Sequence, residues 1–525
     1  MRDPDFTLAA GPTAATARTL AALGSPITYH YDPVFLDAFR RTEAKVGQLF
    51  RTENEIILMQ GEAILGLEAA ARSLVRPGMP VLNLVSGPFG KGMGYWLKNF
   101  GADLHELEVP YDQAIDPDAV ERYLDEHPET ELLCVVHSET PSGTFNDCSL
   151  IGPMARSRGV LTLVDCVSSL AGMPLDAGSW QLDVCVAGPQ KCLGGPPGMS
   201  LVAVSEQAWA AIERNPLAPR ASFLSLLDWR EQWHGRGQFP YTPSVCDIHG
   251  VEAACDQVLE EGLEASIARH EAAAAVCRAG AQEMGLRLWP KSEDIAAACV
   301  TAIAVPEGLD HEAVRNHVRE HYGVMLSAGQ GAGNLVRIGH MGPTADGLKP
   351  IVGLMALGRS LADLGAGVHI GAGVEAALDL LASLQQARLQ PNGPCSRHPT
   401  LPASTRAAAS SATASPATAS AATAAPGKAA PGKASGGAAS LGKASGGAAS
   451  PGPGSVECGC APSGSVAWSR CAGTLTCAAV NAAAFSTSRS RIAARIARCS
   501  VSDPSRLPRR ARVRAWNLPI SPSSR

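Results

Sequence analysis

The chain has 525 residues, enough for two or three domains, and its charge is unevenly distributed. Residues 1–390 carry 28 Lys and Arg against 47 Asp and Glu, a net charge of −19; residues 391–525 carry 16 against 2, a net charge of +14, and the two sum to −5. No apolar run approaches the ~18 residues of a membrane span, and the start of the chain lacks a signal-peptide pattern. We expect an acidic, cytoplasmic, globular body without a membrane partner, followed by a basic tail.

Strand-like and helical segments alternate through the first half of the body. Helices are predicted at residues 34–50 and 63–75, and strands at residues 55–59, 81–85, 104–109, 132–136, 161–165 and 182–186. This alternation predicts an α/β fold in which a mostly parallel sheet is covered by helices and ligand groups gather at the carboxyl ends of the strands. We assign residues 1–250 to this large domain.

The rest of the chain predicts a smaller domain and a tail. A helix at residues 251–261, followed by helices and short strands, indicates a small C-terminal α/β domain over residues 251–390. Residues 391–525 are rich in Ala, Ser, Pro and Gly, a composition that cannot bury enough apolar surface to fold, so we predict a disordered basic tail. Its arginines are not interleaved with aromatic residues, so we expect no nucleic-acid partner. A read-through or frame-shift product would have the same composition.

A single lysine in a glycine- and proline-rich loop is the main chemical signal. Lys191 lies in the loop 187–198, directly after a strand, and Asp165 ends the preceding strand. This order of strand-end Asp and strand-end Lys is typical of a pyridoxal site. There the lysine forms a Schiff base with the aldehyde and the aspartate keeps the ring nitrogen protonated. For an isolated lysine a surface turn would be the better interpretation, but the further residues below favour the site.

Two more turns carry candidate ligand groups. Gly61 separates a strand from a helix, a layout that offers backbone N–H groups and a positive dipole end to an anion, yet Glu62 places a carboxylate at that position. Phe89, in a predicted turn over residues 86–92, can lie flat on a planar ring, although core packing is the simpler role for an aromatic residue there.

With these residues in place, residues 8–384 resemble the class V aminotransferases of pyridoxal-enzyme fold type I. The likeness is dense in residues 65–70, 90–92, 140–144, 188–194, 215–222 and 337–343. It implies a large domain with a mostly parallel, seven-stranded sheet and a smaller C-terminal domain. Within the family the chain is most similar to members that convert free pyridoxamine and pyruvate to pyridoxal and L-alanine, a step in vitamin B6 degradation.

The resemblance also implies roles for individual residues. Lys191 would be the Schiff-base lysine and proton shuttle, and Asp165 the partner of the ring nitrogen. Arg337 would bind the substrate carboxylate through its two-pronged guanidinium. The remaining expected ring-binding residues are Phe89, stacking on the ring, Thr140, near the phenolic oxygen, and Glu62, Gln190 and Thr242, on the side where relatives bind phosphate.

Glu62 decides the expected cofactor. Relatives have a small hydroxyl residue there. A carboxylate about 4 Å from a phosphate costs roughly 4 kcal/mol per charge pair at an effective dielectric constant near 20, or about a thousandfold in affinity. A 5′-hydroxyl can instead donate a hydrogen bond to Glu62. We therefore expect no tightly bound cofactor, with free pyridoxal and pyridoxamine as substrates. The alternatives are resident pyridoxal 5′-phosphate and a Glu62 that only caps its helix.

Other functions stay open at this point. A pyridoxal-phosphate-dependent alanine– or serine–glyoxylate aminotransferase would use the same Lys191, Asp165 and Arg337, and a non-catalytic vitamin sensor whose basic tail binds nucleic acid is a more remote alternative. A cysteine desulfurase is disfavoured because residues 327–337 contain no Cys. Gln330 stands where the most similar members have a second arginine. The sequence therefore leaves open which keto acid is the substrate. We expect a homodimer or homotetramer, in which the turn 239–244 reaches a neighbouring subunit.

Overall fold

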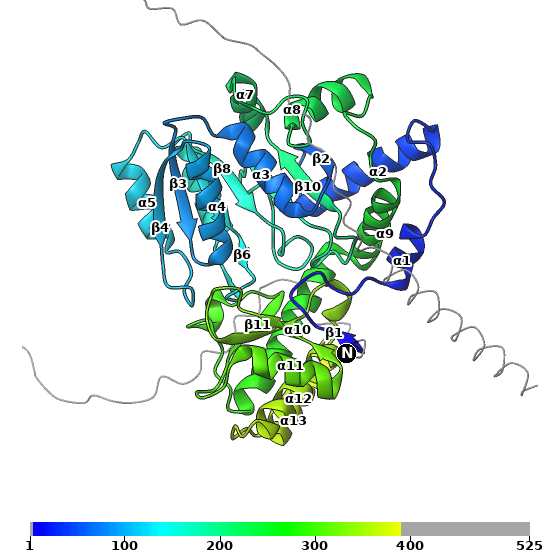
Figure 1. The fold of residues 1–525 in the computed structure, drawn as a ribbon, viewed down its shortest axis with the longest axis vertical. Coiled ribbons are helices and arrows are strands. Elements are labelled where there is room, and N and C mark those ends of the chain that lie inside the picture. The colour runs from blue at the N-terminus through cyan, green and yellow to red at the C-terminus, as the bar shows by residue number, and fades with distance from the viewer. Residues whose placement is uncertain (1–3, 390–525) are drawn as a thin grey trace, which may run out of the picture. The chain divides into compact units, whose positions relative to one another are not determined.

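A seven-stranded sheet forms the centre of the large body in the computed structural model, which describes residues 4–389 (Figure 1). Its strands, in spatial order, are β2 (Glu55–Gln60), β10 (Met199–Val204), β9 (Val184–Ala187), β8 (Leu161–Asp165), β5 (Leu132–Val136), β3 (Pro80–Val85) and β4 (Asp103–Glu108). Only β10 runs antiparallel to its neighbours. The predicted α/β fold with a mostly parallel sheet is confirmed.

Helices cover the sheet, which explains its composition. Strands β5 and β9 are apolar and buried along their full length, as expected when both faces of a parallel sheet are covered. The helices of this part are α1 (Ala17–Leu23), α2 (Pro33–Phe50), α3 (Ala63–Leu74), α4 (Pro88–Asn99), α5 (Pro117–Glu126), α6 (Cys148–Ser157), α7 (Glu206–Arg214), α8 (Leu226–Asp228) and α9 (Val245–Glu261). A one-turn π-helix spans Trp229–His234, and a two-stranded hairpin joins β6 (Ser138–Glu139) to β7 (Thr144–Phe145).

A second group of elements packs around its own apolar cluster. Its strands are β11 (Val300–Ala304), β14 (Leu335–Gly339) and β13 (Ser327–Ala328), and its helices are α10 (Leu263–Glu283), α11 (His311–Tyr322), α12 (Leu348–Asp363) and α13 (Ile370–Leu389). The N-terminal strand β1 (Phe6–Thr7) joins this group by pairing with β12 (Val324–Met325), so its dark-blue ribbon lies among green and yellow elements in Figure 1. The predicted boundary near residue 250 stays a prediction.

The topology brings the carboxyl ends of the central strands to one edge. Asp165 is the last residue of β8 and pairs with Val136 at the end of β5, and β9 ends at Ala187, directly before the loop that carries Lys191. No helix within residues 4–389 is long and apolar enough to cross a membrane. The predicted disordered tail, residues 391–525, lies outside the described residues.

Candidate active site

Lys191 lies in a largely enclosed position, against the N-terminal segment of the chain. Its Nζ donates a hydrogen bond to the carbonyl oxygen of Ala10 at 2.8 Å. Burial lowers the pKa of Lys191, and the positive charge of Arg337 lowers it further. Because the neutral amine is the nucleophile and the base, this environment makes Lys191 more reactive near neutral pH than a solvated lysine.

Asp165 is buried at the end of β8 and interacts with Lys191 through space. Burial raises the pKa of Asp165 to about 6, while a hydrogen bond from the backbone N–H of Val167 and the charge of Lys191 act in the opposite direction. The Val167 N–H lies 2.8 Å from Oδ1. Above about pH 6 the carboxylate is therefore ionised, as a partner for a protonated ring nitrogen must be.

Glu62 caps helix α3 and also binds Gln190. Its Oε2 accepts the backbone N–H of Ile64 at 2.9 Å, and its Oε1 accepts a hydrogen bond from Nε2 of Gln190 at 2.6 Å. The other amide atom, Oε1 of Gln190, is buried and has no hydrogen-bond partner among the described residues. The exposed carboxylate of Glu62 presents a charged acceptor at this end of the site, an arrangement suited to a ligand that donates a hydrogen bond.

Arg337 is held in the interior by three acceptors. The side chain is only 3% exposed, and it donates from Nε to the carbonyl of Ala328 at 2.6 Å, from Nη1 to the carbonyl of Thr140 at 2.7 Å and from Nη2 to Oε1 of Gln330 at 3.2 Å. Burial lowers the pKa of Arg337 to about 10, so it stays charged at neutral pH. A guanidinium has five N–H groups, and the two that remain can bind a carboxylate.

The structure places the other three predicted residues differently. Phe89 lies in the first turn of α4, not in a turn before the helix as predicted, because the helix already begins at Pro88, and its ring is 40% exposed. Thr140 is buried and reaches Arg337 through its backbone carbonyl. Thr242 is exposed, and among the described residues no hydrogen bond links it to the cluster around Lys191. The roles predicted for the three side chains stay predictions.

Sequence reasoning gave no role to a buried carboxylate at the same edge. Both oxygens of Glu139 accept backbone N–H groups from the first turn of α4, those of Phe89 and Gly90, at 3.2 and 2.6 Å. Burial raises the pKa of Glu139 to about 8 although both bonds oppose the rise. The feature of the sequence that could have identified Glu139 is its position shortly after the apolar strand β5. Glu139 holds the turn that carries Phe89.

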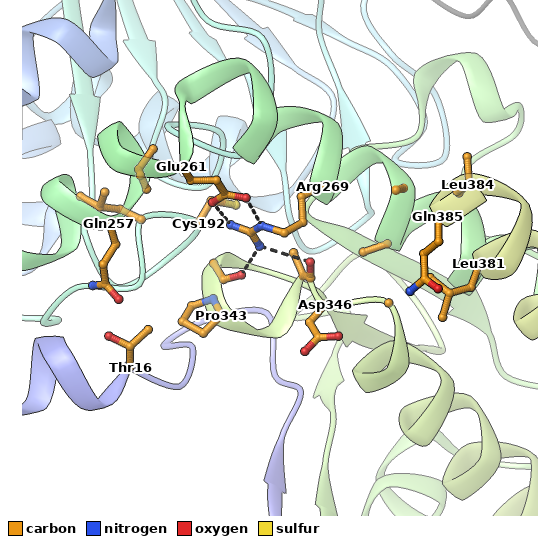
Figure 2. Close-up of a pocket in the computed structure, with 17 residues that line it drawn as sticks. Thr16, Cys192, Gln257, Glu261, Arg269, Pro343, Asp346, Leu381, Leu384 and Gln385 are labelled. Carbon is orange, nitrogen blue, oxygen red and sulfur yellow. Dashed lines mark hydrogen bonds and ion pairs between the residues drawn. The ribbon is translucent and has the colours of Figure 1, made fainter. Parts of the chain in front are cut away.

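A cavity of about 470 Å³ lies behind the lysine loop and is crossed by one arginine (Figure 2). Arg269 of α10 pairs with Glu261 and donates to the carbonyls of Gly342 and Ala345. His270 accepts the N–H of Gly342 at 2.8 Å. These bonds fix the turn after Met341 to α10, and Gly342 in this turn lies against the backbone of the loop that carries Lys191.

Comparisons with known proteins agree with this fold and geometry. The family model "Aminotransferase class-V" matches residues 18–341. The chain therefore belongs to the class V aminotransferases. It is 46% identical over 381 residues to the pyridoxamine–pyruvate transaminase of Mesorhizobium japonicum, which covers 72% of this chain and 97% of that protein.

Two further comparisons give the breadth of the likeness. The crystal structure of pyridoxamine–pyruvate aminotransferase from Mesorhizobium loti matches with a TM-score of 0.71 and 45% identity over 73% of this chain and 98% of its own. The L-aspartate–glyoxylate aminotransferase of Paracoccus denitrificans is 32% identical over 374 residues, covering 70% of this chain and 93% of that protein.

The predicted family, fold type and enzyme class are thus confirmed: the chain is an aminotransferase. Enzymes of this class depend on pyridoxal 5′-phosphate, which matches the alternative that we gave for the cofactor.

Proposed function

We propose that the enzyme transfers the amino group of free pyridoxamine to pyruvate and releases pyridoxal and L-alanine. The single observation that carries this proposal is the paired Glu62 and Gln190 at the start of α3. A hydroxyl group can donate a hydrogen bond to the exposed carboxylate of Glu62, whereas a phosphate dianion has no hydrogen to donate and is repelled by the same charge. The likeness to pyridoxamine–pyruvate transaminases at 46% and 45% identity supports the same substrates.

A pyridoxal ring suits the other residues of the site. Asp165 would hold the protonated ring nitrogen, and Lys191 would face the ring aldehyde. When bound, the ring supplies an electron-withdrawing system that weakens the Cα–H bond of the attached amino compound. A 5′-phosphate would have to displace the hydrogen bond of Glu62 to the Ile64 N–H and lie beside a carboxylate, so that end of the group does not suit these residues.

The chain's own residues would do three things during the transfer. Asp165 keeps the ring nitrogen protonated by its negative charge. Arg337 binds the carboxylate of pyruvate or alanine and fixes which face of the Cα atom is presented. The neutral amine of Lys191 removes a proton from one carbon of the amino compound and returns it to another, a base function that its lowered pKa favours.

We also propose that the enzyme is a homodimer or homotetramer in which the exposed turn around Thr242 reaches the site of a neighbouring subunit. Its mass in solution tests this point.

The charge of Asp165 predicts how ring binding depends on pH. Pyridoxine has the ring but no aldehyde, so it reports ring binding without chemistry at Lys191. Because the pKa of Asp165 is raised to about 6, the carboxylate becomes protonated as the pH falls through that value, and it loses its attraction for the ring nitrogen. We expect pyridoxine affinity to fall about tenfold between about pH 7 and pH 5. Calorimetry measures this fall, and Asp165→Asn should bind weakly without the same pH dependence; an equal slope in the variant would contradict the role.

Binding and turnover of the full-length wild type test the function itself. We expect pyridoxal to bind about a thousandfold more tightly than pyridoxal 5′-phosphate, and pyridoxamine with pyruvate to give pyridoxal and alanine without added cofactor. Absorbance titration with each ligand, followed by product analysis, measures both. An enzyme that retains the phosphate through purification, and needs it to transaminate glyoxylate, would instead be an amino acid–glyoxylate aminotransferase whose Glu62 only caps α3.

A further inference from the structure

The N-terminal segment Leu8–Thr13, here called the strap, passes directly over Lys191. At one end the carbonyl of Leu8 accepts the N–H of Gly339 in β14 at 2.7 Å. At the other end the N–H of Thr13 donates to the carbonyl of Gln190 at 2.9 Å, and the Thr13 hydroxyl donates to the carbonyl of Met341 at 3.0 Å. The strap is therefore fixed both to the lysine loop and to the strand that carries Arg337.

The middle of the strap fits closely around the lysine side chain. A Cβ added to Gly11 would lie 2.4 to 2.6 Å from the Cδ, Cε and Nζ atoms of Lys191, and its φ of +94° also favours glycine. The neighbouring residue, Ala10, is held through both of its backbone groups, which belong to successive peptide units: its N–H donates to Oγ of Ser327 at 2.8 Å, and its carbonyl accepts from Nζ of Lys191 at 2.8 Å.

We infer that the Ala10 carbonyl positions the amine of Lys191 whenever this amine is not joined to a substrate, and that Ser327 is the positioning residue that orients this carbonyl. A lysine side chain has four rotatable bonds, and ordering it costs conformational entropy. A fixed acceptor orders it in advance. Because a carbonyl oxygen can only accept a hydrogen bond, the amine directs an N–H group toward Ala10, and its lone pair points away and stays available for bond formation or proton removal.

This inference rests on Lys191 as the catalytic residue in the proposed function, and two variants separate it from a purely structural role. Ser327→Ala removes one hydrogen bond to the strap without adding volume, and we expect kcat for pyridoxamine with pyruvate to fall about fivefold. Gly11→Ala displaces the amine itself, and we expect a fall of about a hundredfold or more. KM for pyruvate should stay within about twofold in both, because neither change removes one of the three acceptors of Arg337, although Ser327 is paired with Arg337 across β13 and β14.

A conservative variant and a distant control complete the experiment on the full-length enzyme. Ser327→Thr keeps the hydroxyl and should retain wild-type kcat. Ser383→Ala removes a comparable hydroxyl, on the exposed surface of α13, and should have no effect. Because the Ala10 carbonyl favours the protonated amine, its misorientation in Ser327→Ala should also lower the pKa of Lys191 and move the pH profile of kcat to lower pH.

Two results would overturn the inference. One is a folded Ser327→Ala enzyme with wild-type kcat and an unchanged pH profile. The other is a loss of activity confined to KM, which would mean that the strap serves the carboxylate site. Failure of the proposed function is recognised separately, because the wild type itself would then not convert pyridoxamine and pyruvate to pyridoxal and alanine without added cofactor.

Discussion

Replacing Glu62 by threonine should convert the enzyme into one that binds pyridoxal 5′-phosphate. Threonine removes the charge beside the 5′ position but can still cap α3 through its hydroxyl. We expect affinity for the phosphate to rise about a thousandfold, the factor that one charge pair contributes at an effective dielectric constant near 20. Affinity for pyridoxal should fall about tenfold with the loss of a hydrogen bond to a charged acceptor. Absorbance titration with both ligands measures the two changes.

A second capping acid provides the control for this substitution. Asp310 caps α11 through the backbone N–H groups of Glu312 and Ala313, far along the chain from Glu62. Asp310→Thr repeats the change from acid to hydroxyl at a helix cap and should leave both affinities unchanged. If Glu62→Thr leaves the ratio of the two affinities at its wild-type value, Glu62 has only a capping role, and the proposed substrate specificity loses its main support.

Replacing Lys191 by alanine should reduce kcat by about a thousandfold or more, because it removes both the nucleophile and the base. A small primary amine added to the solution can enter the space and should restore part of the activity, as expected if the missing group is an amine. Affinity for pyridoxine, which cannot condense with lysine, should change little. Steady-state kinetics with and without the amine, together with calorimetry, measure these effects.

Lys91 is the matched lysine for this experiment. It pairs with Glu106 and Glu108 of β4 and lies in the first turn of α4, between two glycines. We expect Lys91→Ala to retain kcat. A Lys191→Ala enzyme with substantial activity in the absence of added amine would exclude Lys191 as the catalytic residue.

The sequence predicted most of the large sheet because its strands are short apolar runs that end in polar residues. Asp165 and Lys191 each follow such a run, so their meeting at one edge could be inferred from parallel topology alone. Strand β10 was missed. It follows the loop of Lys191 with no helix between them, and an antiparallel return strand does not fit the alternating pattern used for prediction.

Long-range contacts limited what the sequence could say about the site. The acceptor for Lys191 is a backbone carbonyl 181 residues away, and no residue type marks such a partner. The same holds for Arg337, which is held by the carbonyls of Thr140 and Ala328. The pairing of Glu62 with Gln190 was equally hidden, although both side chains were identified as candidates. Side-chain chemistry is visible in a sequence, and backbone partners are not.

The two edges of the central sheet differ in a way that protects the folded chain from aggregation. One edge strand, β2, is apolar, buried over most of its length and packed against α2. The other, β4, is largely accessible and carries Asp103, Glu106 and Glu108. Strands from two molecules that approached along β4 would bring like charges together, which opposes edge-to-edge pairing. Neutralising these acids should therefore lower solubility before it affects catalysis.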